Sequence, residues 1–146
     1  MAASPVYLVQ SDTTVGLASE DAQVLNRLKG RPEDQPCLQT LGSLKELNRS
    51  VRVPKFARKT VRRAKHRTYI YHDGQARRVV FDGAYEAFLR PFGQLFSTSA
   101  NISGQDFDEA WAREAADVIV TTPEGFSQRS ASSIYRLHKD GATQIR

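Results

Sequence analysis

Short apolar runs alternate with polar stretches along this chain, and the spacing of the apolar residues predicts both strands and helices. Apolar runs rich in β-branched and aromatic residues are typical of buried strands. On this basis we expect strands at 6–9, 38–41, 68–71, 76–81, 95–97, 118–120 and 133–137. Apolar residues at three- and four-residue spacing predict helices at 20–29, 44–48, 55–64, 83–90 and 108–116. Strands and helices that alternate in this way predict an α/β domain with a mixed sheet.

Turn-forming residues predict where several of these elements end. Gly30 follows the helix at 20–29 and is expected to terminate it. The Asp73-Gly74 pair tolerates the positive φ angles of a tight hairpin, so the strands on either side of it are expected to pair. After Ser97 the chain is expected to enter a polar loop.

Two polar stretches, residues 29–32 and 97–104, carry the strongest candidate chemistry. In the first, Arg31 can bind a phosphate or carboxylate through two hydrogen bonds, and Lys29 adds a compact charge. The second combines four hydroxyl groups, an amide and a glycine. Each stretch also has a purely structural interpretation, because cations favour helix C-termini and Asn, Ser and Gly favour turns. Brought together by the fold, the two would form a pocket for a polyphosphate and a small polar substrate.

The composition sets the broad class of protein. A length of 146 residues is that of one domain, so residues 1–146 are treated as a single domain. No apolar run approaches the roughly 20 residues of a membrane span, so no membrane partner is expected. The N-terminus lacks the features of a signal peptide, and Cys37 is the only cysteine, which together favour a reducing, cytoplasmic location.

The positive charge is concentrated in one segment. Residues 52–67 contain eight Lys or Arg and no acid, whereas the net charge of the whole chain is +5. Within the predicted helix at 55–64, the basic residues fall on one broad face. Such a surface attracts phosphates and nucleic acid at long range. It is equally typical of a solvated helix face that has no partner.

Several common kinds of catalytic site are missing from the sequence. His66, His72 and His138 lack the spacing of metal ligands, so no metal site is expected. The chain has no Gly-x-Ser-x-Gly nucleophile elbow and no Walker phosphate loop. Cys37 follows Pro36 in an apolar context, and we interpret it as a buried, unreactive thiol. Any catalysis is therefore expected to depend on positioning and electrostatics, as in attack on a phosphate.

Five polar segments form an ordered set along the chain: Ser11-Asp12-Thr13 with Gly16-Leu17, Lys29-Gly30-Arg31-Pro32, Ser97-Thr98-Ser99-Ala100-Asn101-Ile102-Ser103-Gly104, Ser132-Ser133 and Ile145-Arg146. In this order they resemble the YrdC-like family, over nearly the whole chain. Its best-known members are threonylcarbamoyl-AMP synthases, which convert L-threonine, bicarbonate and ATP into threonylcarbamoyl-adenylate and pyrophosphate for tRNA modification. The resemblance implies a twisted mixed β-sheet flanked by helices around a concave basic cleft.

The resemblance also implies roles for the residues that match the family motifs. Lys29 and Arg31 match its Lys-x-Arg and would hold the ATP phosphates and the carboxylated substrate. Ser99 and Asn101 match its Ser-x-Asn and would bind nucleotide phosphate and help close the site. These four are the candidate catalytic residues. Ser132 aligns with a serine near the nucleotide.

Threonine binding is implied for three further residues, Thr13, Thr68 and Arg78, of which Arg78 would bind the threonine carboxylate. The chain departs from the family near these positions. Val15 replaces a tyrosine expected near threonine, and Ala64-Lys65-His66 replaces a Pro-Gly-Pro turn. Nucleotide binding is therefore better supported by the motifs than threonine binding.

Three functional hypotheses follow. The first is a threonylcarbamoyl-AMP synthase-like nucleotidyltransferase that uses ATP, L-threonine and bicarbonate, with Mg²⁺ as cofactor and tRNA-modification proteins as candidate partners. The second is a non-enzymatic protein that binds tRNA or double-stranded RNA through Arg58, Arg62 and Arg63 together with the cleft. The third is a related carbamoyl-adenylate enzyme with a different acceptor.

Overall fold

One mixed sheet of nine strands runs through residues 4–146, the part of the chain that this computed structural model describes. Its strand order is β7-β1-β2-β6-β3-β5-β4-β8-β9. The strands are β1 (Tyr7–Gln10), β2 (Val15–Ser19), β3 (Leu38–Leu41), β4 (Arg67–Ile70), β5 (Ala76–Val79), β6 (Gln94–Ser99), β7 (Val118–Ile119), β8 (Ser133–Leu137) and β9 (Ala142–Gln144). The pairs β1–β7, β3–β5 and β4–β8 are parallel, and the others are antiparallel. The predicted α/β class with a mixed sheet is confirmed.

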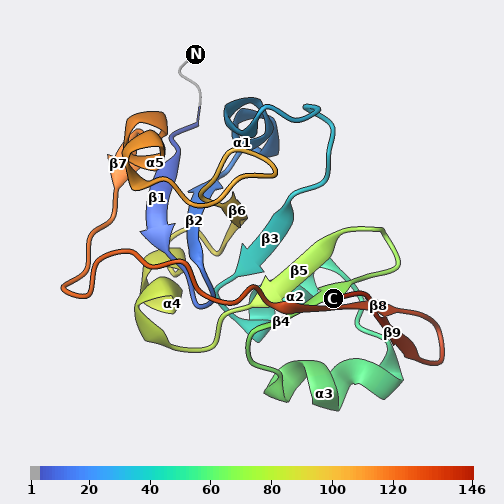
Figure 1. Cartoon of the computed structure of the whole chain (residues 1–146). Coiled ribbons are helices and arrows are strands. Elements are labelled where there is room, and N and C mark those ends of the chain that lie inside the picture. The colour runs from blue at the N-terminus through green and yellow to red at the C-terminus, as the bar shows by residue number, and fades with distance from the viewer. Residues whose placement is uncertain (1–3) are drawn as a thin grey trace.

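Five α-helices and a short 3-10 helix flank the described sheet (Figure 1). They are α1 (Ala22–Lys29), α2 (Leu44–Ser50), η1 (Lys55–Ala57), α3 (Arg58–Arg63), α4 (Gly83–Leu89) and α5 (Glu109–Ala115). The helix expected at 55–64 is therefore two pieces, with one 3-10 turn leading into α3. None of the helices in the described residues is both long enough and apolar enough to span a bilayer.

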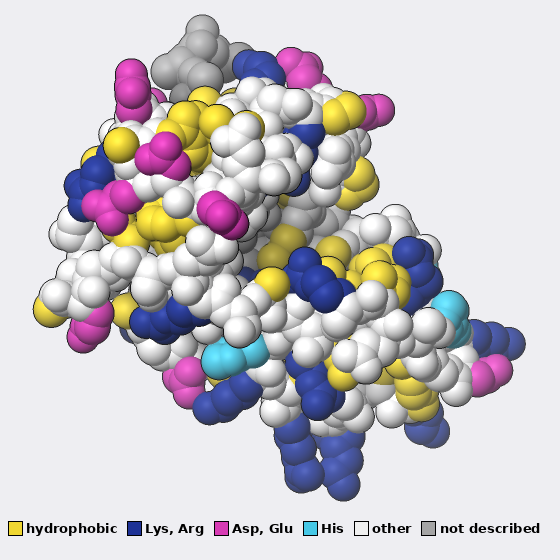
Figure 2. All heavy atoms as spheres, viewed as in Figure 1, with side chains coloured by type: hydrophobic (Ala, Val, Ile, Leu, Met, Phe, Trp, Pro, Cys, Tyr) yellow, Lys and Arg dark blue, Asp and Glu magenta, His cyan; other side chains and the backbone are white. Residues whose placement is uncertain are grey.

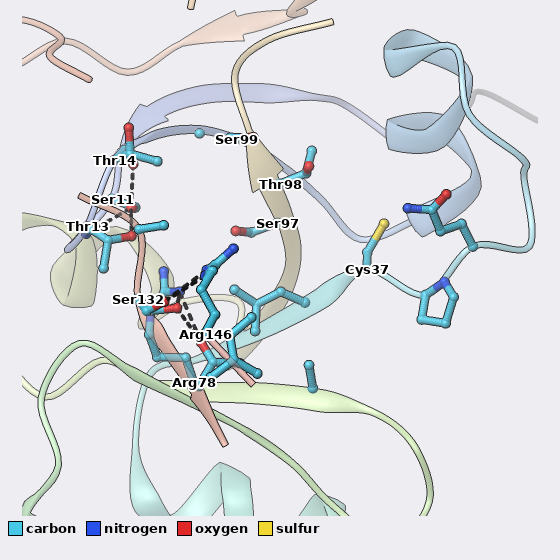
Figure 3. Close-up of a pocket in the computed structure, with 18 of the residues that line it drawn as sticks. Ser11, Thr13, Thr14, Cys37, Arg78, Ser97, Thr98, Ser99, Ser132 and Arg146 are labelled. Carbon is cyan, nitrogen blue, oxygen red and sulfur yellow. Dashed lines mark hydrogen bonds between the residues drawn. The ribbon is translucent and has the colours of Figure 1, made fainter. Parts of the chain in front are cut away.

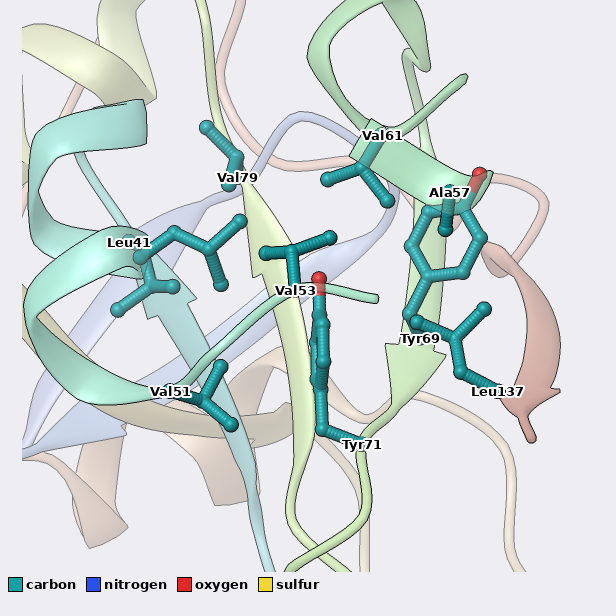
Figure 4. Packing of buried hydrophobic residues seen from close by; sticks show 10 residues of the cluster. Leu41, Val51, Val53, Ala57, Val61, Tyr69, Tyr71, Val79 and Leu137 are labelled. Carbon is teal, nitrogen blue, oxygen red and sulfur yellow. The ribbon is translucent and has the colours of Figure 1, made fainter. Parts of the chain in front are cut away.

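Side chains alternate between the two faces of the sheet, and each face has its own helices. On one face, Leu41, Tyr69 and Val79 pack with residues of α2, η1 and α3 in the cluster drawn in Figure 4. Leu8 and Leu17 pack with α1 and α5, and register places Leu17 on this same face. On the opposite face α4 covers β1, β2 and β6. The part of that second face formed by β3, β5, β4 and β8 is where polar side chains gather.

Strands β2 and β9 were not predicted, and β6 is longer than expected. The expected strands do not include residues 15–19, yet all five residues of β2 are buried between β1 and β6. Strand β2 lies so close to β6 that a Cβ on Gly16 would be 3.0 Å from the Thr98 carbonyl oxygen. Pairing of Gly16 with Ser99 extends β6 to Ser99, so residues 97–99 are strand, where a loop was expected.

Candidate functional site

A cavity of about 440 Å³ opens on the sheet face opposite α1, α2, α3 and α5. Its walls come from β6, β5, β4, the turn after β1, the segment between α1 and β3, the residues just before β8 and the C-terminal Arg146 (Figure 3). It is lined by Ser11, Thr13, Thr14, Gly16, Arg31, Gln35, Pro36, Cys37, Leu38, Thr68, Ala76, Arg78, Ser97, Thr98, Ser99, Ala131, Ser132, Ile134 and Arg146. Eight of these residues carry hydroxyl groups and three carry guanidinium groups, and none is acidic. The space-filling view shows the surface hollowed between the part with α1 and the part with β8 (Figure 2). We call this cavity the cleft.

The two polar stretches identified in the sequence meet beside the cleft. Gly30 ends α1 in the left-handed conformation, with φ 72°, and so turns the chain at Lys29. The Lys29 ammonium then donates to the Ser99 carbonyl oxygen at 2.7 Å, to Ser99 Oγ at 3.2 Å and to Asn101 Oδ1 at 3.2 Å. These contacts join positions seventy residues apart in the chain.

Lys29 holds this junction from behind the cleft wall. It is 3% exposed, and neither Lys29 nor Asn101 lines the cleft, whereas Arg31 and Ser99 do. The Asn101 amide donates to two backbone oxygens of its own loop, those of Ile102 and Gln105. Burial, and next the nearby Arg31 charge, lower the pKa of Lys29 to about 8. Of the four candidate catalytic residues, Arg31 and Ser99 thus face the cleft. The other two, Lys29 and Asn101, hold the segments around them in place.

Arg31 is oriented by residues that the sequence did not identify. Its Nε donates to Asn26 Oδ1 at 2.6 Å, and its Nη2 lies 3.3 Å from Cys37 Sγ. The fully buried Asn26 also donates to the Glu33 and Gln35 carbonyl oxygens, at 2.9 and 2.8 Å. Cys37 is buried in the apolar cluster with Leu8 and Leu25, as expected, and its thiol also lines the cleft beside the Arg31 guanidinium.

Thr68, Ser132 and Arg78 form a hydrogen-bonded group on the opposite wall. Thr68 Oγ1 and Ser132 Oγ are 2.7 Å apart, and Arg78 Nη1 lies 3.5 and 3.4 Å from them. Register explains the meeting, because β5 and β8 flank β4 and alternate residues of each strand face the cleft. Thr13 lines the cleft from the turn after β1 and bonds to Ser11 Oγ.

Arg146 is a further cleft residue to which the sequence analysis gave no role. Its Nε and Nη2 donate to the Ser132 carbonyl oxygen, at 3.1 and 2.9 Å. Figure 3 shows Arg78, Ser132 and Arg146 together, with Cys37 on the far side of the cleft. The signal was present in the sequence as the final Ile145-Arg146 pair, whose place next to Ser132 depends on tertiary structure.

The departures from the family motif have structural counterparts. Val15 is 1% exposed and packs in the apolar cluster below α1 and α5, away from the cleft. In the Ala64-Lys65-His66 segment, His66 has φ 57°, and the Lys65 ammonium lies 3.0 Å from Asp82. This segment leads directly into β4 and so into Thr68.

The basic surface lies away from the cleft. Arg58, Arg62 and Arg63 are exposed on α3, and Arg58 Nε donates to the Val53 carbonyl oxygen. Because α3 covers the sheet face that carries Tyr69, this surface and the cleft are on opposite faces. Figure 2 shows the basic side chains projecting at the lower edge of the view, where Figure 1 places α3. A single RNA surface built from both, as the second hypothesis assumed, does not fit this arrangement.

No family model and no curated protein matches the chain. Solved structures do: MTH1692 from Methanobacterium thermoautotrophicum (21% identity, 97% of this chain and 79% of that one, TM-score 0.70), P. abyssi Sua5 complexed with L-threonine (17%, 97% and 50%, 0.78) and E. coli YciO (16%, 98% and 82%, 0.77). The chain therefore has a YrdC-like fold, as its motifs predicted. It spans about half the length of Sua5.

Proposed function

We propose that this protein is a nucleotidyltransferase of the threonylcarbamoyl-AMP synthase type. One observation carries the proposal most directly: the Lys29–Arg31 stretch and the Ser99–Asn101 stretch meet at a cleft whose lining has three arginines and no acid. Guanidinium groups and a wall of small hydroxylated residues suit a polyphosphate beside a small polar substrate. The likeness to a Sua5 structure complexed with L-threonine agrees with threonine as that second substrate.

The chemistry requires no side-chain nucleophile. The amine of L-threonine and bicarbonate first give a carbamate, with loss of water. A carbamate oxygen attacks the α-phosphorus of ATP in line, a new phosphorus–oxygen bond forms, and the bond to the β-phosphate oxygen breaks. Pyrophosphate leaves with the electron pair of that bond. The role of the protein is to bring the two anions together and to stabilise charge on the transferring phosphate.

Arg31 and Arg146 are the residues we assign to the phosphates, because both line the cleft and neither forms an ion pair with an acid in the described residues. Lys29 holds Ser99 and Asn101 in place behind them. Thr13, Thr68 and Arg78 are assigned to threonine, and Ser132 lies between the two groups.

A protein-held metal does not fit this cleft. Residues 4–146 contain no group of three or more His, Cys, Asp or Glu side chains that could hold a metal ion. We therefore expect Mg²⁺ to enter as the complex with ATP, coordinated by phosphate oxygens and water.

The test is release of pyrophosphate from ATP, bicarbonate and Mg²⁺, with and without L-threonine. We expect release to depend on all of them and to fall at least a hundredfold in Arg31→Ala. Arg113→Ala is the matched control, because Arg113 is paired with Glu109 on the surface of α5. Absence of threonine-dependent release from the folded protein would contradict the proposal.

The pyrophosphate-release assay also identifies which amino acid is the acceptor substrate. The proposal of a different acceptor draws on Val15, which leaves no tyrosine hydroxyl at the position where the family motif has one. Replacing L-threonine by each other amino acid in turn separates the two cases, since only the true acceptor supports pyrophosphate release.

A second candidate function, RNA binding, is supported by the exposed cations of η1 and α3. All eight basic residues between 52 and 67 are exposed. We expect duplex RNA or tRNA to bind with a steep salt dependence. Replacing Arg58, Arg62 and Arg63 by glutamine is expected to reduce the slope of log K against log salt by about 2–3. Binding that is insensitive to salt would exclude this candidate.

A further inference from the structure

Arg78 already has a carboxylate partner inside the protein. Its guanidinium donates from Nη2 to Asp12 Oδ1 at 2.9 Å and from Nε to both carboxylate oxygens, at 3.2 and 3.1 Å. Both side chains are buried, with 4% and 10% of their surface exposed. The edge of the guanidinium group formed by Nε and Nη2, where a carboxylate usually binds through two hydrogen bonds, is therefore already occupied by Asp12.

Asp12 is held in place by the turn that carries it. Ser11 Oγ donates to the Thr14 carbonyl oxygen at 2.5 Å and accepts from the Thr13 backbone amide at 3.1 Å. The Ser11 and Thr13 hydroxyls are also 3.2 Å apart. A turn closed by its own hydrogen bonds presents Asp12 to β5 in a defined position, 66 residues away in the chain.

The third nitrogen of the Arg78 guanidinium group, Nη1, has only long hydrogen bonds. Arg78 Nη1 has two N–H donors, and its contacts to Thr68 Oγ1 and Ser132 Oγ are 3.5 and 3.4 Å long, near the limit for a hydrogen bond. Both of these hydroxyls line the cleft. A ligand oxygen placed here would find a guanidinium donor and two hydroxyl groups together.

We propose that Asp12 is a positioning residue: it fixes Arg78 so that Nη1, together with the Thr68 and Ser132 hydroxyls, receives an oxygen of the acceptor substrate. The identity of that acceptor as L-threonine rests on the proposed function. Because Asp12 also balances the charge of Arg78, this wall discriminates against phosphate and in favour of a small group with one carboxylate. The polyphosphate is left to Arg31 and Arg146.

The neighbouring residue supplies a matched control. Arg77 is buried on the other face of β5, and it forms the same kind of bidentate pair, with Asp73 at 3.0 and 2.7 Å. Arg77 does not line the cleft. Asp73→Asn therefore changes a carboxylate–guanidinium pair of the same strand without touching the proposed acceptor wall.

The experiment follows the Arg78 Nε–H signal by NMR in arginine-labelled protein, assigned with Arg78→Lys, while L-threonine is added. In the wild type we expect a signal protected from solvent exchange that shifts saturably with L-threonine. In Asp12→Asn we expect faster exchange of this signal and at least tenfold weaker L-threonine binding. Thermal stabilisation by ATP is expected to be unchanged, and Asp73→Asn is expected to behave as the wild type in each measurement.

Each outcome decides a separate statement. An unchanged Arg78 signal in Asp12→Asn, or L-threonine affinity within twofold of the wild type, overturns the positioning role. If Asp12→Asn alters the Arg78 signal but the wild type binds no L-threonine, Asp12 does position Arg78 and the proposed threonine function fails. Should Asp12→Asn not fold, Asp12→Glu takes its place, since the longer carboxylate shifts the pair and is expected to give the same changes to a smaller degree.

Discussion

Replacing Lys29 with methionine is expected to change the pH dependence of stability. Burial lowers the pKa of Lys29 from 10.5 in the unfolded chain to about 8 in the folded protein. Below pH 8 both states carry the charge, and the folded state bears the whole cost of burying it. Between these two values the folded protein releases the proton while the unfolded chain keeps it, so stability rises with pH. The difference between these two pKa values corresponds to about 2–4 kcal/mol in the free energy of unfolding, because one pKa unit is equivalent to roughly 1.4 kcal/mol.

Urea unfolding at pH 7, 8.5 and 10 measures this effect. The free energy of unfolding of the wild type, relative to Lys29→Met, is expected to increase by about 2–3 kcal/mol between pH 7 and pH 10. Burial raises the pKa of Tyr85, so it opposes stability at high pH, but it does so in both proteins and cancels in the difference. The exposed Lys59→Met serves as control. Parallel pH curves for wild type and Lys29→Met would refute the argument that this ammonium is buried.

Three further substitutions test how the fold builds the cleft. Asn26→Ala removes the four hydrogen bonds of a fully buried side chain and is expected to lower stability by about 2–4 kcal/mol in urea unfolding and to weaken ATP binding. Gly16→Ala places a Cβ about 3.0 Å from the Thr98 carbonyl oxygen, and a loss of about 1–3 kcal/mol with a lower Tm is expected. Leu47→Ala empties part of the core beneath α2 and is expected to cost about 2–5 kcal/mol while ATP affinity at a permissive temperature stays unchanged.

The elements that sequence patterning predicted well are those with a strong local signal. The strands β3 and β8 have the predicted bounds, and α1 ends at Gly30 as expected. Strand β2 was missed because Gly16 and Ser19 weaken a strand pattern locally. Its burial comes from neighbours far along the chain, which no local pattern contains.

Local sequence patterns and long-range contacts also contribute differently to the candidate site. Arg31, Ser99 and Thr68 line the cleft as their motifs suggested, although their roles stay predictions. The partnership of Asp12 with Arg78 could not be predicted, because it joins a turn to a strand 66 residues away. A motif names the residue types of a site, whereas the orientation of each side chain depends on such long-range contacts.

The most direct test of the central claim is a calorimetric titration of Mg·ATP into the full chain. If the cleft holds the triphosphate, the wild type binds ATP at one site, and the double replacement of Arg31 and Arg146 by alanine weakens binding about a hundredfold or more. Arg113→Ala is expected to bind as the wild type. Equal ATP affinity in the wild type and the double variant, or no ATP binding by the folded wild type, would contradict the account.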